Sequence, residues 1–205
     1  MFDKILDIIF PPVCGFCGEK NYGYLCKECE SKIRKNSTSR KEKVKGKYFS
    51  EKISLFSYKG EIRNKILGYK FSGKSYMYKT FVKIILNDKK IYDILKSCDI
   101  ITNVPLHKKR KNERGYDQSE LIAKEIAHNI KNLKFAKVLI KVRNIEKQSL
   151  LDKKERANNI KNAYEIINEE IICNKKIILF DDVYTSGATT NECARMLKRK
   201  RSKRS

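Results

Sequence analysis

A short apolar run near the C-terminal end of the chain leads directly into two acids and then into a series of small residues. Residues 177–180 read Ile-Ile-Leu-Phe, Asp181 and Asp182 follow, and Thr185 to Thr189 are all small. This order predicts a buried strand, a tight loop and then a helix. Ligands of open α/β sheets bind at the carboxyl end of such strands. The segment therefore predicts an α/β fold with a ligand site at this edge.

The residue types in this segment indicate what the ligand is. Small residues let backbone N–H groups surround an anion at a helix N-terminus. Carboxylates do not suit a phosphate, but they accept hydrogen bonds from ribose hydroxyls or hold a metal ion. An ordinary strand, turn and helix could use Asp and Thr as turn and cap residues, but two acids together with an all-small loop exceed what a turn requires. A sugar phosphate satisfies both halves, with Asp181 and Asp182 on the ribose and the phosphate held by Thr185, Ser186, Gly187, Ala188 and Thr189.

The remaining apolar periodicity predicts further strands and helices in alternation. Strands are expected over 53–58, 99–104, 136–142 and 176–180, and helices over 61–70, 76–96 with a break near Asn87-Asp88, 117–130 and 189–199. Asp117 is a typical N-cap, with Glu120 three residues later. Residues 106–116 are expected to form a basic loop. Strands that alternate with helices favour a parallel sheet with helices on both faces.

Four of the seven cysteines fall in one short array near the N-terminus. Cys14 and Cys17 form one Cys-x-x-Cys pair, and Cys26 and Cys29 form a second. Two such pairs have the spacing of two zinc knuckles, and four thiolates close a tetrahedral site with no position left for water. We therefore predict a structural Zn²⁺ site. A redox dithiol would need only one pair.

The net charge of +23 suggests affinity for polyanions, because clustered cations release counterions from phosphates. A bias toward Lys, Ile and Asn offers another explanation, since it raises the Lys content without selection for a ligand. No apolar run approaches the roughly 18 residues of a membrane-spanning helix. Asp3 and Asp7 interrupt the apolar N-terminus, which argues against a secretory signal. We expect a cytoplasmic protein.

Several motifs together resemble the ComF family of competence proteins. The segment 177–189 is similar to the phosphoribosyl-diphosphate (PRPP) signature of type I phosphoribosyltransferases. Residues 103–107 (Asn-Val-Pro-Leu-His) and 113–118 (Glu-Arg-Gly-Tyr-Asp-Gln) resemble a second ComF block. Phe10-Pro11-Pro12 before the four cysteines also fits that family. The resemblance covers residues 1 to about 198.

The resemblance implies a phosphoribosyltransferase-like domain behind a small zinc ribbon. The expected divisions are an N-terminal helix and ribbon over 1–35, a linker over 36–50, the α/β domain over 51–199 and a basic tail over 200–205. Asp181 and Asp182 would contact the ribose and act in catalysis, and Mg²⁺ would accompany PRPP. The implied pyrophosphate site comprises Pro105, Leu106, Arg110 and Arg114. Whether a phosphoribosyl group is transferred, and to which acceptor, stays open.

The chain departs from the family pattern at its C-terminal end. The family has a further apolar strand after the last helix, whereas residues 198–205 here are almost all Lys and Arg. We therefore expect the final strand to be missing, as in a frameshifted or truncated product. A functional basic arm for nucleic acid is the alternative.

A different class of function also fits the sequence. The family's association with DNA uptake suggests a non-catalytic adaptor that handles single-stranded DNA and works with DNA-uptake proteins. Aromatic residues close to basic ones could stack on bases, although packing in the core would also explain them. These residues are Tyr69, Phe71, Tyr76 and Tyr78.

Overall fold

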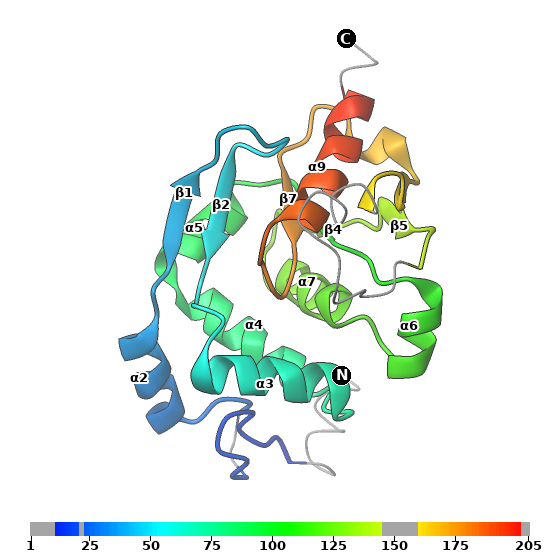
Figure 1. Cartoon of the computed structure of the whole chain (residues 1–205). Coiled ribbons are helices and arrows are strands. Elements are labelled where there is room, and N and C mark those ends of the chain that lie inside the picture. The colour runs from blue at the N-terminus through cyan, green and yellow to red at the C-terminus, as the bar shows by residue number, and fades with distance from the viewer. Residues whose placement is uncertain (1–10, 21–22, 145–159, 202–205) are drawn as a thin grey trace.

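The computed structural model describes residues 11–20, 23–144 and 160–201 (Figure 1). In chain order its elements are α2 (Lys27–Asn36), β1 (Arg40–Lys43), β2 (Glu51–Ser54), α3 (Gly60–Phe71), α4 (Met77–Asn87), α5 (Lys89–Lys96), β3 (Ile100–Asn103), α6 (Lys108–Arg114), α7 (Gln118–His128), β4 (Lys134–Phe135), β5 (Leu139–Lys141), β6 (Tyr164–Ile166), the 3-10 helix η1 (Glu169–Ile172), β7 (Ile177–Phe180) and α9 (Ala188–Arg201). The helix expected before Pro12 falls almost entirely outside the described residues.

A parallel sheet forms the centre of the molecule, as the sequence predicts. Its strand order is β4–β3–β7, with β3 parallel to both neighbours. The register pairs Asn103 with Phe180, so β3 and β7 end at the same edge. Among the described residues, β7 is an outer strand of this sheet.

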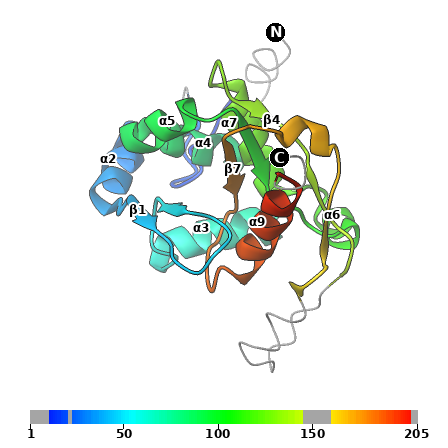
Figure 2. The same ribbon diagram turned by 90° about the horizontal axis from the view of Figure 1, so that it is seen from above.

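Helices cover both faces of the sheet because its strands are apolar on both sides. Ile101 and Ile178 pack with the cluster formed by α4, α5 and α7. Their neighbours Ile100 and Ile177 pack on the opposite side, in a cluster that includes Cys193 of α9. Figure 2 shows α4, α5 and α7 on one side of β7 and α9 on the other. The predicted two-faced arrangement is confirmed.

The predicted helix breaks and caps are confirmed at two places. Asp88 separates α4 from α5, and its carboxylate accepts a hydrogen bond from the Ile91 N–H at 3.1 Å. Asp117 caps α7 by accepting from the N–H groups of Ser119 and Glu120. Both carboxylates satisfy N–H groups that have no partner within their own helix.

Residues 36–50 are not simply a linker, because they contain β1. This strand pairs antiparallel with β2 in a two-stranded ribbon, and Val44 N–H donates to the Ser50 carbonyl at 2.9 Å. All four residues of β1 are exposed. Cross-strand ion pairs of Lys41 with Glu51 and of Lys52 with Glu42 support a pairing that apolar periodicity could not reveal.

The basic segment 106–116 was also wrongly expected to be a loop, since it contains helix α6. Lys, Arg and Glu favour helices, and the His107 side chain caps α6 by accepting from the Lys109 N–H. Gly115 ends it with φ +82°. The strand expected over 136–142 is shorter: β5 covers Leu139–Lys141 and pairs antiparallel with β6, outside the parallel sheet.

Candidate functional site

The acid pair lies where the sequence predicts, directly after β7. Asp182 is mostly buried, with 8% of its side chain exposed. Its backbone N–H donates to the Asp181 carboxylate at 3.0 Å. The two carboxyl groups therefore lie at the carboxyl end of a parallel strand, close to each other.

Lys70, the second-last residue of α3, neutralises one of the two acids. Its Nζ lies 2.8 Å from Asp182 Oδ2, and 18% of the lysine side chain is exposed. An ion pair this shielded from solvent is costly to break, because the remaining charge would be left buried. No local sequence pattern connects Lys70 with Asp182, which lies more than 100 residues later in the chain.

Asp181 lies in surroundings that oppose its ionisation. Desolvation raises the pKa of its carboxyl group well above the ordinary value, and the nearby charge of Asp182 adds to this effect. Lys70 acts in the opposite direction on the same pKa. Lys141 and Cys193 also interact electrostatically with Asp181. Two cations thus act on the acid pair, Lys70 from α3 and Lys141 from β5.

The loop after the acids is short and sterically constrained at Gly187. Thr185 and Ser186 are exposed, Gly187 is buried, and Ala188 and Thr189 form the first turn of α9. Gly187 has φ +71°, and a Cβ atom there would overlap the Tyr184 ring. Only glycine fits both the backbone conformation and the space.

The β1–β2 ribbon contacts this loop and the following helix. Tyr48 N–H donates to Asn191 Oδ1 at 2.8 Å. Lys52 Nζ lies 4.8 Å from the centre of the Tyr184 ring. Tyr48, which belongs to the segment expected to be a linker, therefore contacts the first turns of α9.

The loop after β3 lies beside the acid pair. Val104 N–H donates to the Phe180 carbonyl, which brings Pro105 and Leu106 to the same edge. Asp117 holds this loop in place by accepting from Leu106 N–H at 2.9 Å and from Asn103 Nδ2 at 3.4 Å. Burial raises the pKa of Asp117, while the N–H groups of Leu106 and Glu120 lower it.

Arg110 and Arg114 both lie on α6 and have different neighbours. Desolvation is the main cause that lowers the pKa of the Lys141 side chain, and the positive charge of Arg110 is the second. Arg114 donates to Gln118 Oε1, and its guanidinium lies 5.1 Å from the Phe71 ring centre. Arg110 therefore acts on β5, whereas Arg114 faces the end of α3.

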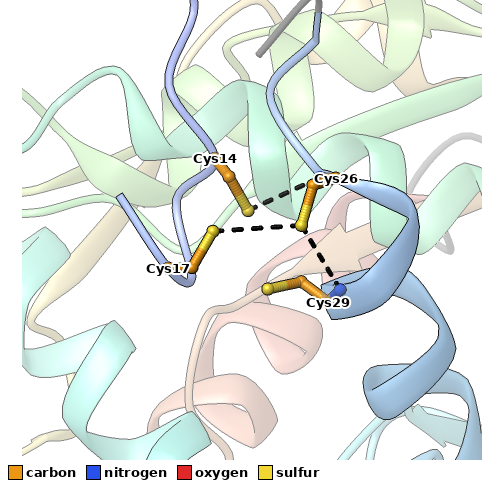
Figure 3. A group of neighbouring side chains, drawn as sticks. All are labelled: Cys14, Cys17, Cys26 and Cys29. Carbon is orange, nitrogen blue, oxygen red and sulfur yellow. Dashed lines mark hydrogen bonds between the residues drawn. The ribbon is translucent and has the colours of Figure 1, made fainter. Parts of the chain in front are cut away.

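The four N-terminal cysteines converge, as predicted (Figure 3). Their sulfur atoms all lie within 4.8 Å of one another, and Cys17 Sγ is 3.9 Å from Cys26 Sγ. Thiolates bound to one zinc ion at about 2.3 Å are about 3.8 Å apart. The donor set and spacing therefore fit one structural zinc ion. Within the described ranges, no other group of three or more potential metal ligands converges in this way.

Backbone N–H groups point at the sulfur atoms of Cys14 and Cys26. Burial opposes ionisation of Cys14, yet hydrogen bonds from Cys17, Cys26 and Phe16 N–H groups lower its pKa to about 6. Cys26 is the N-cap of α2, and its sulfur accepts from Cys29 N–H at 3.4 Å. Backbone donors of the kind that surround Cys14 stabilise a thiolate, which is the form that binds a metal.

The cysteine module is fixed to α3 and α4 by side chains that reach its backbone. Thr80 Oγ1 donates to the Tyr24 carbonyl at 2.6 Å, and Lys83 Nζ donates to the Leu25 carbonyl at 3.2 Å. Lys65 of α3 donates to the Phe16 carbonyl. These contacts accompany an apolar cluster that includes Phe16, Leu25 and Ile84.

The N-terminal part of the chain matches a known family model, and most of the chain is similar to known bacterial proteins. Residues 5–51 match a family model described as a double zinc ribbon domain. Over most of its length, the chain is similar to competence protein F of Haemophilus influenzae. The two are 26% identical over 192 residues, which cover 92% of this chain and 79% of that protein.

Two further relatives extend the comparison. Competence protein ComFC of Bacillus subtilis is 27% identical over 196 residues, covering 90% of this chain and 71% of that protein. DNA utilization protein YhgH of Salmonella typhi is 33% identical over 101 residues, and the chain spans only 44% of its length. These comparisons confirm the resemblance to the ComF family.

None of the helices in the described part of the chain has the length and apolar character needed to span a bilayer.

Proposed function

We propose that this protein binds the ribose 5-phosphate portion of PRPP or of a nucleotide at the carboxyl end of β7. The observation that carries this proposal is the position of Asp181 and Asp182 between the half-buried parallel strand β7 and the small-residue loop that begins α9. The sheet around them would correspond to a phosphoribosyltransferase-like core. Sites of this kind form where strands of an α/β sheet end.

The residues would divide the ligand between them. The Asp181 and Asp182 carboxyl groups would accept hydrogen bonds from ribose hydroxyls, and the loop Thr185–Thr189 would hold the phosphate at the N-terminus of α9. Pro105, Leu106, Arg110 and Arg114 would surround the pyrophosphate, because Arg binds paired phosphate oxygens bidentately. Mg²⁺, when bound with PRPP, would offset the charge of the pyrophosphate.

Calorimetric titration of PRPP with Mg²⁺ into zinc-loaded protein tests this site. We expect saturable binding that the Asp181→Asn, Asp182→Asn double variant loses. Asp93→Asn is the matched control, since Asp93 is an exposed acid on α5. Binding that survives in the double variant, or no binding by the folded wild-type protein, would refute the proposal. A positive result would justify a screen of acceptor bases for phosphoribosyl transfer.

We further propose that the protein acts in DNA uptake, in the cytoplasm. This is supported by the names of its relatives, competence and DNA utilization proteins, and by its net charge of +23. A non-catalytic adaptor on single-stranded DNA is the second candidate function. Binding to single strands that weakens steeply as salt rises, without any PRPP binding, would favour the adaptor.

A further inference from the structure

The turn between α3 and α4 exposes two aromatic side chains. Phe71, the last residue of α3, is 67% exposed, and Tyr76, just before α4, is 39% exposed. The two nearby tyrosines differ, because Tyr69 is fully buried and Tyr78 packs against the same core cluster. The structure therefore separates the four aromatic residues of this region into two in the core and two at the surface.

Phe71 makes a contact that indicates what its ring could bind. The Arg114 guanidinium lies 5.1 Å from the ring centre. This cation covers part of the ring, while two thirds of the residue stays open to solvent. A ring placed beside an arginine in this way can accept a second flat, electron-rich partner, because stacking and cation–π contacts reinforce each other.

The surroundings of this turn are basic and border the candidate site. Lys74 is exposed within the turn. Lys70, directly before Phe71, is paired with Asp182. An anionic ligand with a flat ring would thus find cations next to the exposed aromatic faces. An aliphatic peptide would gain little from this charge.

We propose that Phe71, together with Tyr76, is a stacking site for an unpaired nucleobase, whose phosphates lie against Lys74 and Arg114. Aromatic side chains set among cations are how proteins hold bases without reading their sequence. The base can belong to a single strand or to a free nucleotide. This proposal does not require the site at Asp181 and Asp182, so the two can fail independently.

Binding of an end-labelled oligothymidylate of about ten nucleotides, followed by fluorescence anisotropy, tests the proposal against an abasic oligonucleotide of equal length. Phe71→Ala should weaken oligothymidylate binding about tenfold and leave abasic binding unchanged. The slope of log affinity against log salt should not change, because no cation is removed. Phe71→Tyr should restore binding.

Ile171→Ala is the matched control, since Ile171 is an exposed apolar residue on η1. The melting temperature of each variant verifies folding. A 5′-mononucleotide competitor separates the two sources of the base: competition that depends on Phe71 indicates a free nucleotide, and its absence indicates a single strand. Equal binding of oligothymidylate by wild type and Phe71→Ala would overturn the proposal. So would an equal loss for the abasic strand, or no nucleotide binding by the wild type.

Discussion

Lys70 and Asp182 form an ion pair, with Nζ 2.8 Å from Oδ2, between the last turn of α3 and the end of β7. The lysine also opposes the rise in the pKa of Asp181. One cation therefore acts on both acids of the candidate site. This relationship gives the first prediction.

Lys70→Met should weaken PRPP binding at least tenfold at neutral pH. Removing Lys70 leaves the Asp182 carboxylate uncompensated, so the acid pair would repel the phosphates of PRPP. Lys70→Arg should retain most of the affinity, because it keeps the charge. Lys131→Met, at an exposed position after α7, is the control. Titration calorimetry measures all four proteins, and equal affinity of wild type and Lys70→Met would contradict the prediction.

Asp181 should make stability depend on pH. The pKa of Asp181 is higher in the folded protein than in the unfolded chain. The contribution of Asp181 to stability is therefore complete below the unfolded pKa of about 3.9, and it is lost as pH rises through the folded pKa. Asp181→Asn should therefore melt at a higher temperature than wild type at neutral pH. Each 1 kcal/mol of added unfolding free energy corresponds to a rise of about 2–4 °C in the melting temperature. The difference should disappear below about pH 4. Thermal melts across this range measure it, and a variant that melts lower than wild type at pH 7 would refute it.

Cys14→Ser should release zinc and loosen the N-terminal module. Metal content by mass spectrometry should fall, and amide exchange should increase from Val13 to Ile33, because structural zinc supplies folding free energy. The side-chain hydrogen bonds from Thr80 and Lys83 to the carbonyl groups of the module should also weaken. Cys173→Ser is the control, since Cys173 lies outside the cluster. Full zinc content in Cys14→Ser would argue against the four-thiol site.

Gly187→Ala should be more damaging than Gly46→Ala. Both glycines have similar positive φ angles, +71° and +69°, but a Cβ at Gly46 meets nothing within 4 Å. Alanine at a positive φ angle should lower the free energy of unfolding by about 1–2 kcal/mol in both variants. Overlap with the Tyr184 ring should add about 1–3 kcal/mol for Gly187 alone. Chemical denaturation measures both variants, and equal losses would show that the Tyr184 contact is unimportant.

The sequence predicted those elements whose apolar residues repeat with a clear period. The strands β3 and β7, the break at Asp88 and the cap at Asp117 all have local signals, and so do the paired cysteines. The position of the acid pair also followed, because the apolar strand β7, which is half-buried in the structure, runs directly into Asp181.

The missed features depend on contacts between distant segments or on charged residues. Strand β1 is fully exposed and has no apolar face to detect. The propensity of Lys and Arg for helices was underestimated in α6, whose charged residues suggested a loop. The pairing of Lys70 with Asp182 arises only when α3 crosses the sheet edge, which no spacing within either segment reveals.

Helix α3 makes one contact with the cysteine module through Lys65 and another with the acid pair through Lys70. Both contacts need the correct length of helix between them, since each added or deleted residue turns the helix by about 100°. An insertion or deletion between these two lysines would rotate one side chain away from its partner while the other kept its place. Natural variants of this segment should therefore exchange residues freely at solvent-facing positions and keep its length constant.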